Sequence, residues 1–306
     1  MEALIKQQLV LYIFIIAGVI LGKWRKDMAD KSSLLSFITV NLLLPCKMFL
    51  NFSKNFTVTY LKTNYITIFI SIGILCLLLA LGGLVGKLLS PKDKYGQKVY
   101  KYSITVSNYA YFGYVLMENA FGGAALNNMM VFCLPFSLYC YTFGVGLLMD
   151  KKASVKSLLT PTPIAIALGI VLGLTGVKVP EVITTVASSA SAAMGPITML
   201  LVGLVLSGFS LKQMLPDCQS WVFSVIKLVA LPAVIFGICK ALALFMTLPA
   251  SVYPVAVFVA AMPCGLNPVI YPKLIGKDCS MGAKLIPLTA ILSVVTIPLW
   301  IHLTGL

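Results

Sequence analysis

Two stretches of the sequence place helix-breaking residues and side-chain amides inside otherwise apolar segments. One reads Ser107-Asn-Tyr-Ala-Tyr-Phe-Gly113 and the other reads Ala261-Met-Pro-Cys-Gly-Leu-Asn-Pro268. Proline lacks a backbone N–H and clashes with the preceding helical turn, so the two prolines of the second stretch should unwind it. The freed helix N-termini, together with Asn108 and Asn267, would offer N–H groups that suit a carboxylate.

The residues expected to contact a substrate lie at or next to these two breaks. They are Ser107, Asn108, Tyr109, Gly113, Pro263, Gly265, Asn267 and Pro268. Unwound backbone inside a bilayer is tolerated only where it lines a cavity, because each unsatisfied polar group costs several kcal/mol. The alternative for either break alone is a kink in a packed helix, with the asparagine bridging to a neighbouring helix.

Few ionisable residues lie inside the apolar segments, and such residues are functional by default. Glu118 could carry a coupling proton, or it could lie at the outer membrane interface. Lys47 could attract a substrate anion or act as a movable charge, or it could extend its amine to the outer headgroups. Lys227 and Lys284 are expected to be anchors near the interface.

Neither a nucleophile–base pair nor a metal cluster accompanies these residues. His302 is the only histidine, and the eight cysteines are scattered singly without a CxxC pair. We interpret the cysteines as small apolar side chains within helices. The sequence therefore predicts no catalytic residue, no metal, no cofactor and no enzymatic activity.

The composition of the 306 residues excludes a soluble domain. Hydrophobic residues make up 59% of the chain and charged residues only 10%, whereas a soluble domain carries roughly 25% charged residues. Disorder is excluded for the same reason, because disordered chains are rich in charge and poor in apolar residues. The remaining class is an integral membrane protein.

The elements that must position the two breaks are membrane-spanning helices. A bilayer core is about 30 Å thick, so a spanning helix needs roughly 20 mostly apolar residues. Ten such segments are expected, at 5–22, 34–52, 65–89, 100–121, 127–149, 161–175, 180–209, 221–244, 252–275 and 285–303. All are apolar on every side, which is not the alternating pattern of a barrel strand.

The basic residues predict the orientation. If the N-terminus lies outside, most of the 23 lysines and arginines fall in loops on the cytoplasmic side. Both termini are therefore expected outside, in a multi-pass protein of the plasma or inner membrane. The net charge of +14 then belongs to the inner face and does not indicate nucleic-acid binding.

A repeated motif indicates duplication. The string Ala17-Gly-Val-Ile-Leu-Gly22 is similar to Leu168-Gly-Ile-Val-Leu-Gly173, and the same separation along the chain places Pro45 on Pro196. Both prolines are expected to interrupt an apolar helix.

At nearly the same separation, Gly122 and Gly276 each close a broken span. Residues 1–150 are predicted to form one five-helix repeat and residues 151–306 a second. An odd number of helices per repeat requires the second copy to be inverted, as in many secondary transporters. The polar stretch 150–160 would join the repeats.

Four segments, taken in order, resemble a known family. They are Ser107–Gly122, Thr160–Gly169, Met194–Gly203 and Ala261–Pro268. In these the chain resembles the auxin efflux carrier (AEC) family, whose bacterial members are often labelled malate or malonate permeases. The chain departs from the family pattern in two ways: the first segment has no proline at its break, and the third expected span lacks an acid that plant members use near the site. Neither auxin nor the proton relay of plant members is therefore implied.

The resemblance implies an all-helical membrane fold like that of the NhaA antiporter and the bile-acid symporters. It has ten transmembrane helices in two inverted five-helix repeats, with broken, crossing helices 4 and 9. Helices 1, 2, 6 and 7 would form a scaffold, often dimeric, and helices 3–5 and 8–10 a transport domain. Family members move organic anions by an elevator-like motion.

The sequence and the resemblance together predict a secondary active transporter for small organic anions, namely carboxylates. Its expected partners are the anion, a coupling H⁺ or Na⁺, membrane lipid and a second copy of the chain. A rival reading is a sodium-coupled symporter of the bile-acid type, although Glu118 would be its only acidic ligand. A membrane enzyme is a second rival, and a channel or sensor without transport is a third.

Overall fold

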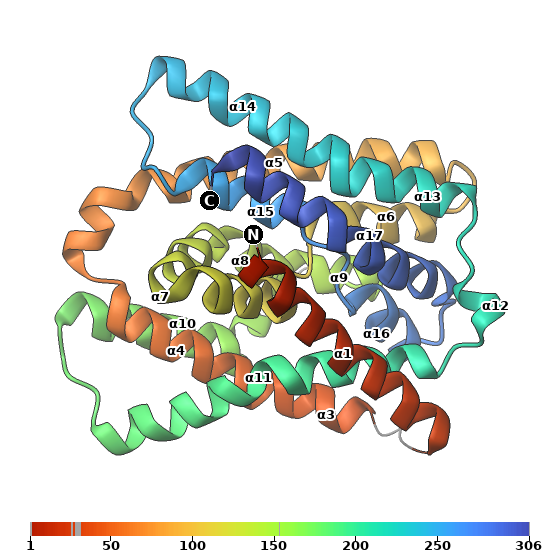
Figure 1. Cartoon of the computed structure of the whole chain (residues 1–306), viewed down its shortest axis with the longest axis horizontal. Coiled ribbons are helices and arrows are strands. Elements are labelled where there is room, and N and C mark those ends of the chain that lie inside the picture. Colours follow the sequence, from red (N-terminus) through yellow and green to blue (C-terminus); the bar gives the residue numbers. More distant parts are fainter. Residues whose placement is uncertain (1, 26, 28–31, 153, 306) are drawn as a thin grey trace.

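The computed structural model describes residues 2–25, 27, 32–152 and 154–305, and these residues are almost entirely helical (Figure 1). Among them the one extended pairing, an isolated bridge, joins Ser107 to Cys264. Six of the described helices are long and apolar enough to cross a membrane, and seven if a pair bent by 49° counts as one span. Many large apolar side chains lie on the outside, as expected for a protein surrounded by lipid.

The first half of the chain forms helices that begin earlier than the apolar segments alone predict. Thr57 accepts a hydrogen bond from the Tyr60 N–H at 3.1 Å and Asp93 accepts one from the Tyr95 N–H at 2.9 Å, so polar caps start two of them. In order, the helices are α1 (Glu2–Trp24), α3 (Ser32–Ile38), α4 (Leu44–Asn55), α5 (Val58–Leu89), α6 (Lys94–Thr105), α7 (Tyr114–Phe132), α8 (Leu134–Tyr139) and α9 (Val145–Leu148). The π-helical turns are η1 (Thr39–Leu43), η2 (Tyr109–Gly113) and η3 (Cys140–Gly144).

The second half follows the expected segments closely, with one of them divided by a break. In order, the elements are η4 (Val155–Leu159), α10 (Pro161–Thr175), α11 (Glu181–Ser207), α12 (Leu211–Met214), α13 (Cys218–Val225), the π-helical turn η5 (Ile226–Ala230), α14 (Leu231–Phe245), α15 (Val252–Ala261), α16 (Asn267–Leu274) and α17 (Ser280–Thr304). Helices α10 and α15 are apolar but shorter than the helices that qualify as spans.

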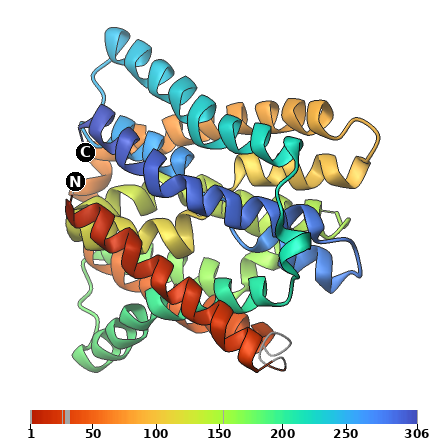
Figure 2. The ribbon, with the colours of Figure 1, turned by 45° about the vertical axis from the view of Figure 1, so that its right-hand side comes forward.

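The helices gather into two groups. In both views α1, α4, α10 and α11 lie together, whereas α5, α13 and α14 lie on the opposite side of the molecule (Figures 1 and 2). Helices α7, α8 and α15 lie between the two groups. Helix α1 begins and helix α17 ends on the same side.

Glycine allows close backbone contact in the first group. Helix α1 packs along α11, and a Cβ added to Gly18 would lie 2.3 Å from the carbonyl oxygen of Leu200. Helix α10 packs along α4, and a Cβ added to Gly173 would lie 2.4 Å from the carbonyl oxygen of Phe52. Such small-residue contacts hold membrane helices together without a hydrophobic driving force. Both glycines belong to the repeated motif.

The expectation that Pro45 and Pro196 interrupt their helices is wrong. The helix around Pro45 continues from Ser32 to Asn55, and α11 runs unbroken through Pro196. The π-helical turn η1 directly precedes Pro45 and widens the helix where the proline ring would otherwise clash. Proline is tolerated within apolar helices because local adjustments and neighbouring groups satisfy the freed backbone.

Candidate functional site

The two predicted breaks are present, and they lie against each other. Helix α6 ends at Thr105 and η2 begins at Tyr109, while α15 ends at Ala261 and α16 begins at Asn267. The Asn108 N–H donates a hydrogen bond of 2.8 Å to the carbonyl of Pro263. The extended pairing described above joins the same two breaks. Two helix N-termini and two helix C-termini therefore meet at one place.

The ends of the broken segments also behave as predicted. Gly122 interrupts α7 with a φ of 84°, and Gly276 follows α16 with a φ of 68°. Residues with side chains rarely adopt such angles, so glycine is needed where the chain turns out of each helix.

A cavity of about 80 Å³ lies beside the breaks and is also lined by residues of α3, η1 and α4. Its polar lining comes mainly from hydroxyl and amide groups. These belong to Ser36, Tyr102, Ser107, Asn108, Tyr109, Tyr111, Ser137, Tyr141, Asn267 and Tyr271. The cavity can therefore hold a small molecule by hydrogen bonds, with tyrosine rings contacting its apolar parts.

The two asparagines differ in their surroundings. Asn267 donates a hydrogen bond of 2.5 Å from Nδ2 to the hydroxyl of Tyr102. The buried Oδ1 of Asn108 has no hydrogen-bond partner within the described structure. Leaving a buried polar atom unpaired costs about 1–3 kcal/mol, so the unpaired oxygen of this cavity-lining residue would gain from a hydrogen-bond donor.

The other predicted site residues divide into two sets. Ser107, Tyr109 and Gly265 line the cavity. Gly113, Pro263 and Pro268 do not line it.

Those three residues shape the breaks instead. A Cβ on Gly113 would lie 2.7 Å from the Met129 side chain, and Pro268 stands in the first turn of α16. The carbonyl of Pro263 accepts the hydrogen bond from Asn108 already described. Their expected role in contacting a substrate therefore finds no support in the described geometry.

All four π-helical turns of the described chain contribute to this region. Residues of η1, η2 and η3 line the cavity, and η5 carries Lys227, whose ammonium donates a 2.7 Å hydrogen bond to Ser107. A π-helical turn widens the helix by one residue and often occurs at a functional site.

Lys227 is not the interface anchor that the sequence predicts. Its side chain is completely buried, and its ammonium also donates to the carbonyl of Ile104 at 3.1 Å. Lys284, by contrast, is partly exposed and forms a 2.8 Å ion pair with Asp217. A lysine extends its amine to the headgroups only where its helix faces lipid, and the Lys227 side of η5 faces the first break.

A known protein family matches the second half of the chain. Residues 145–301, just over half of the chain, match the family described as membrane transport protein, which is the auxin efflux carrier family. The chain belongs to this family. No curated protein matches the sequence. Family members are membrane transporters, so the protein is a multi-pass transporter that handles a small-molecule substrate in a lipid bilayer.

Lys47 and Glu118, which the sequence presents separately, form an ion pair in the transporter. The Lys47 side chain on α4 is 4% exposed, and that of Glu118 on α7 is 41% exposed. They lie at a second cavity of about 420 Å³ between α1, α4, α7 and a stretch of α11 rich in small residues. The pair therefore links α4, a helix of the first group, to the central helix α7.

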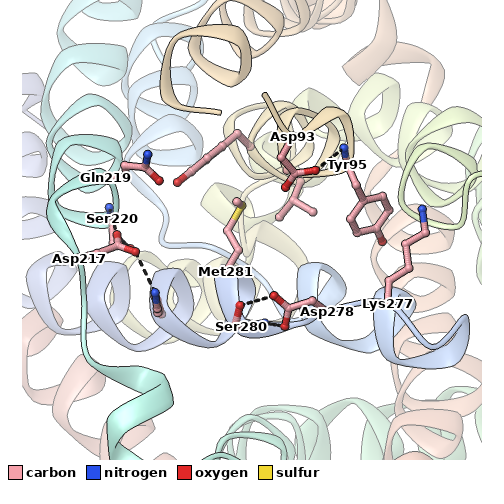
Figure 3. Close-up of a pocket in the computed structure, with 13 residues that line it drawn as sticks. Asp93, Tyr95, Asp217, Gln219, Ser220, Lys277, Asp278, Ser280 and Met281 are labelled. Carbon is pink, nitrogen blue, oxygen red and sulfur yellow. Dashed lines mark hydrogen bonds and ion pairs between the residues drawn. The ribbon is translucent and has the colours of Figure 1, made fainter. Parts of the chain in front are cut away.

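A third cavity of about 340 Å³ lies where α6, α13 and α17 begin (Figure 3). Its carboxylates are already engaged: Asp93 caps α6, Asp278 accepts from Ser280, and Asp217 accepts from Ser220. Burial raises the pKa of Asp217, but the hydrogen bonds from Lys284 and Ser220 outweigh this effect and lower the pKa to about 2. These acids start and fasten helices, and we assign them no part in binding.

The joint between the halves carries a further ionic contact. Asp150, which has a φ of 51°, pairs with both Lys98 and Lys277. The hydrogen bonds from Lys277 and Lys98 hold the pKa of Asp150 below its usual range. The contact fastens the end of α9 to α6 and to the segment before α17.

Proposed function

We propose that the protein is a secondary transporter for small organic anions, which opens its binding site to each side of the membrane in turn by alternating access. The observation that carries this proposal is the meeting of the two helix breaks at a cavity with an unpaired amide oxygen. In transporters, discontinuous helices place backbone and half-helix ends around the substrate near the bilayer midplane.

A carboxylate suits the groups that line this cavity. The N-termini of η2–α7 and of α16 direct partial positive charge and free N–H groups toward the breaks. The Asn108 oxygen can accept a hydrogen bond from a hydroxyl of the same substrate. We assign substrate binding to Asn108, Asn267, Ser107, Tyr109 and Gly265.

The proposed architecture is ten helices in two inverted repeats, residues 1–150 and 151–306. Two symmetric contacts support it. The first expected span packs on the seventh (α1 on α11), and the sixth packs on the second (α10 on α4). The two broken spans also meet. The group of α1, α4, α10 and α11 corresponds to the scaffold, and the remaining helices correspond to a transport domain that moves as an elevator.

Several further features of the proposal concern the surroundings of the site. Both termini face outward from the plasma or inner membrane, and two copies associate through the scaffold. The Lys47–Glu118 pair joins the proposed scaffold to the proposed transport domain, where it would respond to movement and to a coupling H⁺ or Na⁺.

Uptake of labelled malate, malonate and succinate into proteoliposomes tests the proposal. Wild-type protein should give saturable uptake, and Asn108→Ala and Asn267→Ala should each lower kcat/KM by about ten- to a hundredfold, since a hydrogen bond to a charged group is worth about 1.5–3 kcal/mol. Asn64→Ala is the matched control, because Asn64 lies away from the cavity and donates to the carbonyl of Tyr60 in its own helix. Unchanged uptake in both site variants would remove the site assignment.

A further inference from the structure

Lys227 carries a buried positive charge next to the cavity. Its side chain is fully buried on η5, and its ammonium donates to Ser107 Oγ at 2.7 Å and to the Ile104 carbonyl at 3.1 Å. An ammonium has three N–H donors, and the Ser107 hydroxyl and the Ile104 carbonyl accept from two of them.

This charge lacks a counterion, unlike four other lysines of the described chain. Within the described residues, Lys47 pairs with Glu118, Lys284 pairs with Asp217, and Lys98 and Lys277 pair with Asp150. No carboxylate of the described chain lies within 4.0 Å of the Lys227 ammonium. A buried charge without a counterion is costly, and an ionisable residue inside a membrane protein is functional by default.

Ser107 connects this charge to the cavity. Ser107 lines the cavity, and its hydroxyl accepts the hydrogen bond from Lys227, which leaves its own proton free to be donated. A hydroxyl that accepts from an ammonium becomes a stronger donor, because hydrogen bonds in a chain polarise one another. Only the Ser107 hydroxyl would therefore separate an anion in the cavity from the Lys227 ammonium.

The bond to Ile104 also satisfies a carbonyl in the last turn of α6. Helix C-termini leave four such carbonyls unpaired, and a nearby cation is favourable there. A cap of this kind explains why the lysine is tolerated, but it predicts the same stabilisation whether the cavity holds an anion or a neutral molecule. The two roles therefore differ in one measurable property, the preference of the transporter for charge.

We propose that Lys227 is the fixed countercharge of the cavity, acting through Ser107 to make the site select a carboxylate over an uncharged molecule of the same shape. The inference rests on the proposed transport of organic anions and identifies the residue that sets the charge specificity. Lys227 is a positioning residue in this role, because Ser107 lies between it and the cavity.

The experiment compares a carboxylate with its amide. Uptake of a labelled carboxylate is measured in proteoliposomes containing wild type, Lys227→Met, Lys227→Arg or Lys284→Met. The unlabelled competitors are malate, malonate and succinate and the corresponding diamides. A unit charge a few ångströms from another at the effective dielectric of a protein site changes binding by about a hundredfold or more. Lys227→Met should lower the preference for the carboxylate by that factor while the affinity for the diamide stays unchanged.

The remaining variants separate charge from structure. Lys227→Arg, which keeps the charge, should retain the preference for the carboxylate to within a few fold, and Lys284→Met should leave it unaltered. Equal weakening of the carboxylate and the diamide in Lys227→Met, or an unchanged preference, would overturn the inference and leave a capping role. Absence of saturable wild-type uptake for every carboxylate would instead overturn the proposed function, and the inference with it.

Discussion

At the scale of single residues, the two asparagines of the breaks have different tasks. Asn108 lines the cavity and has a buried side-chain oxygen without a partner in the described structure, whereas Asn267 is held by the hydroxyl of Tyr102. Asn108 therefore has an unused acceptor for a substrate donor, and Asn267 must either be oriented by Tyr102 or leave it when a substrate arrives. The hydrogen bond between Tyr102 and Asn267 also connects α6 to α16 across the cavity.

A double-mutant cycle tests this connection. Tyr102→Phe should lower uptake several-fold because Asn267 loses its acceptor. Asn267→Ala alone should lower uptake by a larger factor. Combined, the two substitutions should cost less than the product of their separate effects, since both remove the same hydrogen bond. Effects on kcat/KM that multiply independently would contradict a shared role.

Asp217 gives a prediction about acid stability. Its pKa is lowered to about 2 in the folded protein, against about 3.9 for a free aspartate. The carboxylate therefore stabilises the fold above about pH 4, and this contribution is lost as the pH falls through about 2. Because the side chain is 46% exposed, its contribution is below about 1 kcal/mol.

Asp217→Asn keeps a capping side chain but removes the charge. The variant should unfold at a slightly lower temperature than wild type at about pH 7, and the difference should shrink toward pH 2. An equal difference at both pH values would show that the charge is not responsible.

At the scale of elements, the helix breaks, the π-helical turns and the contacts between helices form the cavity and its surroundings. The breaks join α6 and η2 to α15 and α16, and π-helical turns widen four helices around the cavity. A polar row on α4 faces α7: Lys47 pairs with Glu118, and Asn51 donates a 2.9 Å hydrogen bond to Asn127. In the proposed elevator motion these contacts between α4 and α7 would have to break and form again.

A charge exchange tests the Lys47–Glu118 contact. Lys47→Glu should abolish most uptake, because two carboxylates would then face each other and the one at position 47 would be buried. Lys47→Glu combined with Glu118→Lys should restore at least part of it. Lys54→Glu makes the same charge change at an exposed site on α4 and serves as the control. A double variant no more active than Lys47→Glu would contradict a functional pair.

At the scale of the whole molecule, close helix contacts hold the first group together. Gly203→Ala should lower the melting temperature of the solubilised protein, because a Cβ there would lie 2.1 Å from the Ile15 carbonyl oxygen. Overpacking of this kind costs about 1–3 kcal/mol. Gly237→Ala is the matched control, since no atom lies within 4 Å of its added Cβ. Similar melting of the two variants would argue against tight packing of α1 on α11.

Hydropathy alone predicts where most helices lie, because a bilayer requires long apolar segments whatever their neighbours are. The second break is also predictable, since proline and glycine act locally, whereas the first break, at residues 106–108, contains neither residue. That the helices continue through Pro45 and Pro196 could not be predicted. A π-helical turn precedes Pro45 and α11 tolerates Pro196, and neither feature has a simple sequence pattern.

Long-range contacts are the part that the sequence does not disclose. The burial of Lys227 depends on which side of η5 meets the first break, and the pairing of Lys47 with Glu118 joins residues far apart in the chain. The residue types at the cavity could be predicted, but not the difference between Asn108 and Asn267. That difference arises from Tyr102, a residue whose sequence context gives no signal.

The most direct test of the central claim is an experimental density map of the transporter with a transported carboxylate bound. The substrate should lie between the two breaks, within hydrogen-bonding distance of the Asn108 side chain and on the cavity side of Ser107. Density for the carboxylate in the cavity beside Lys47 and Glu118, or in the one lined by Asp93 and Asp217, with the breaks unoccupied, would contradict the account.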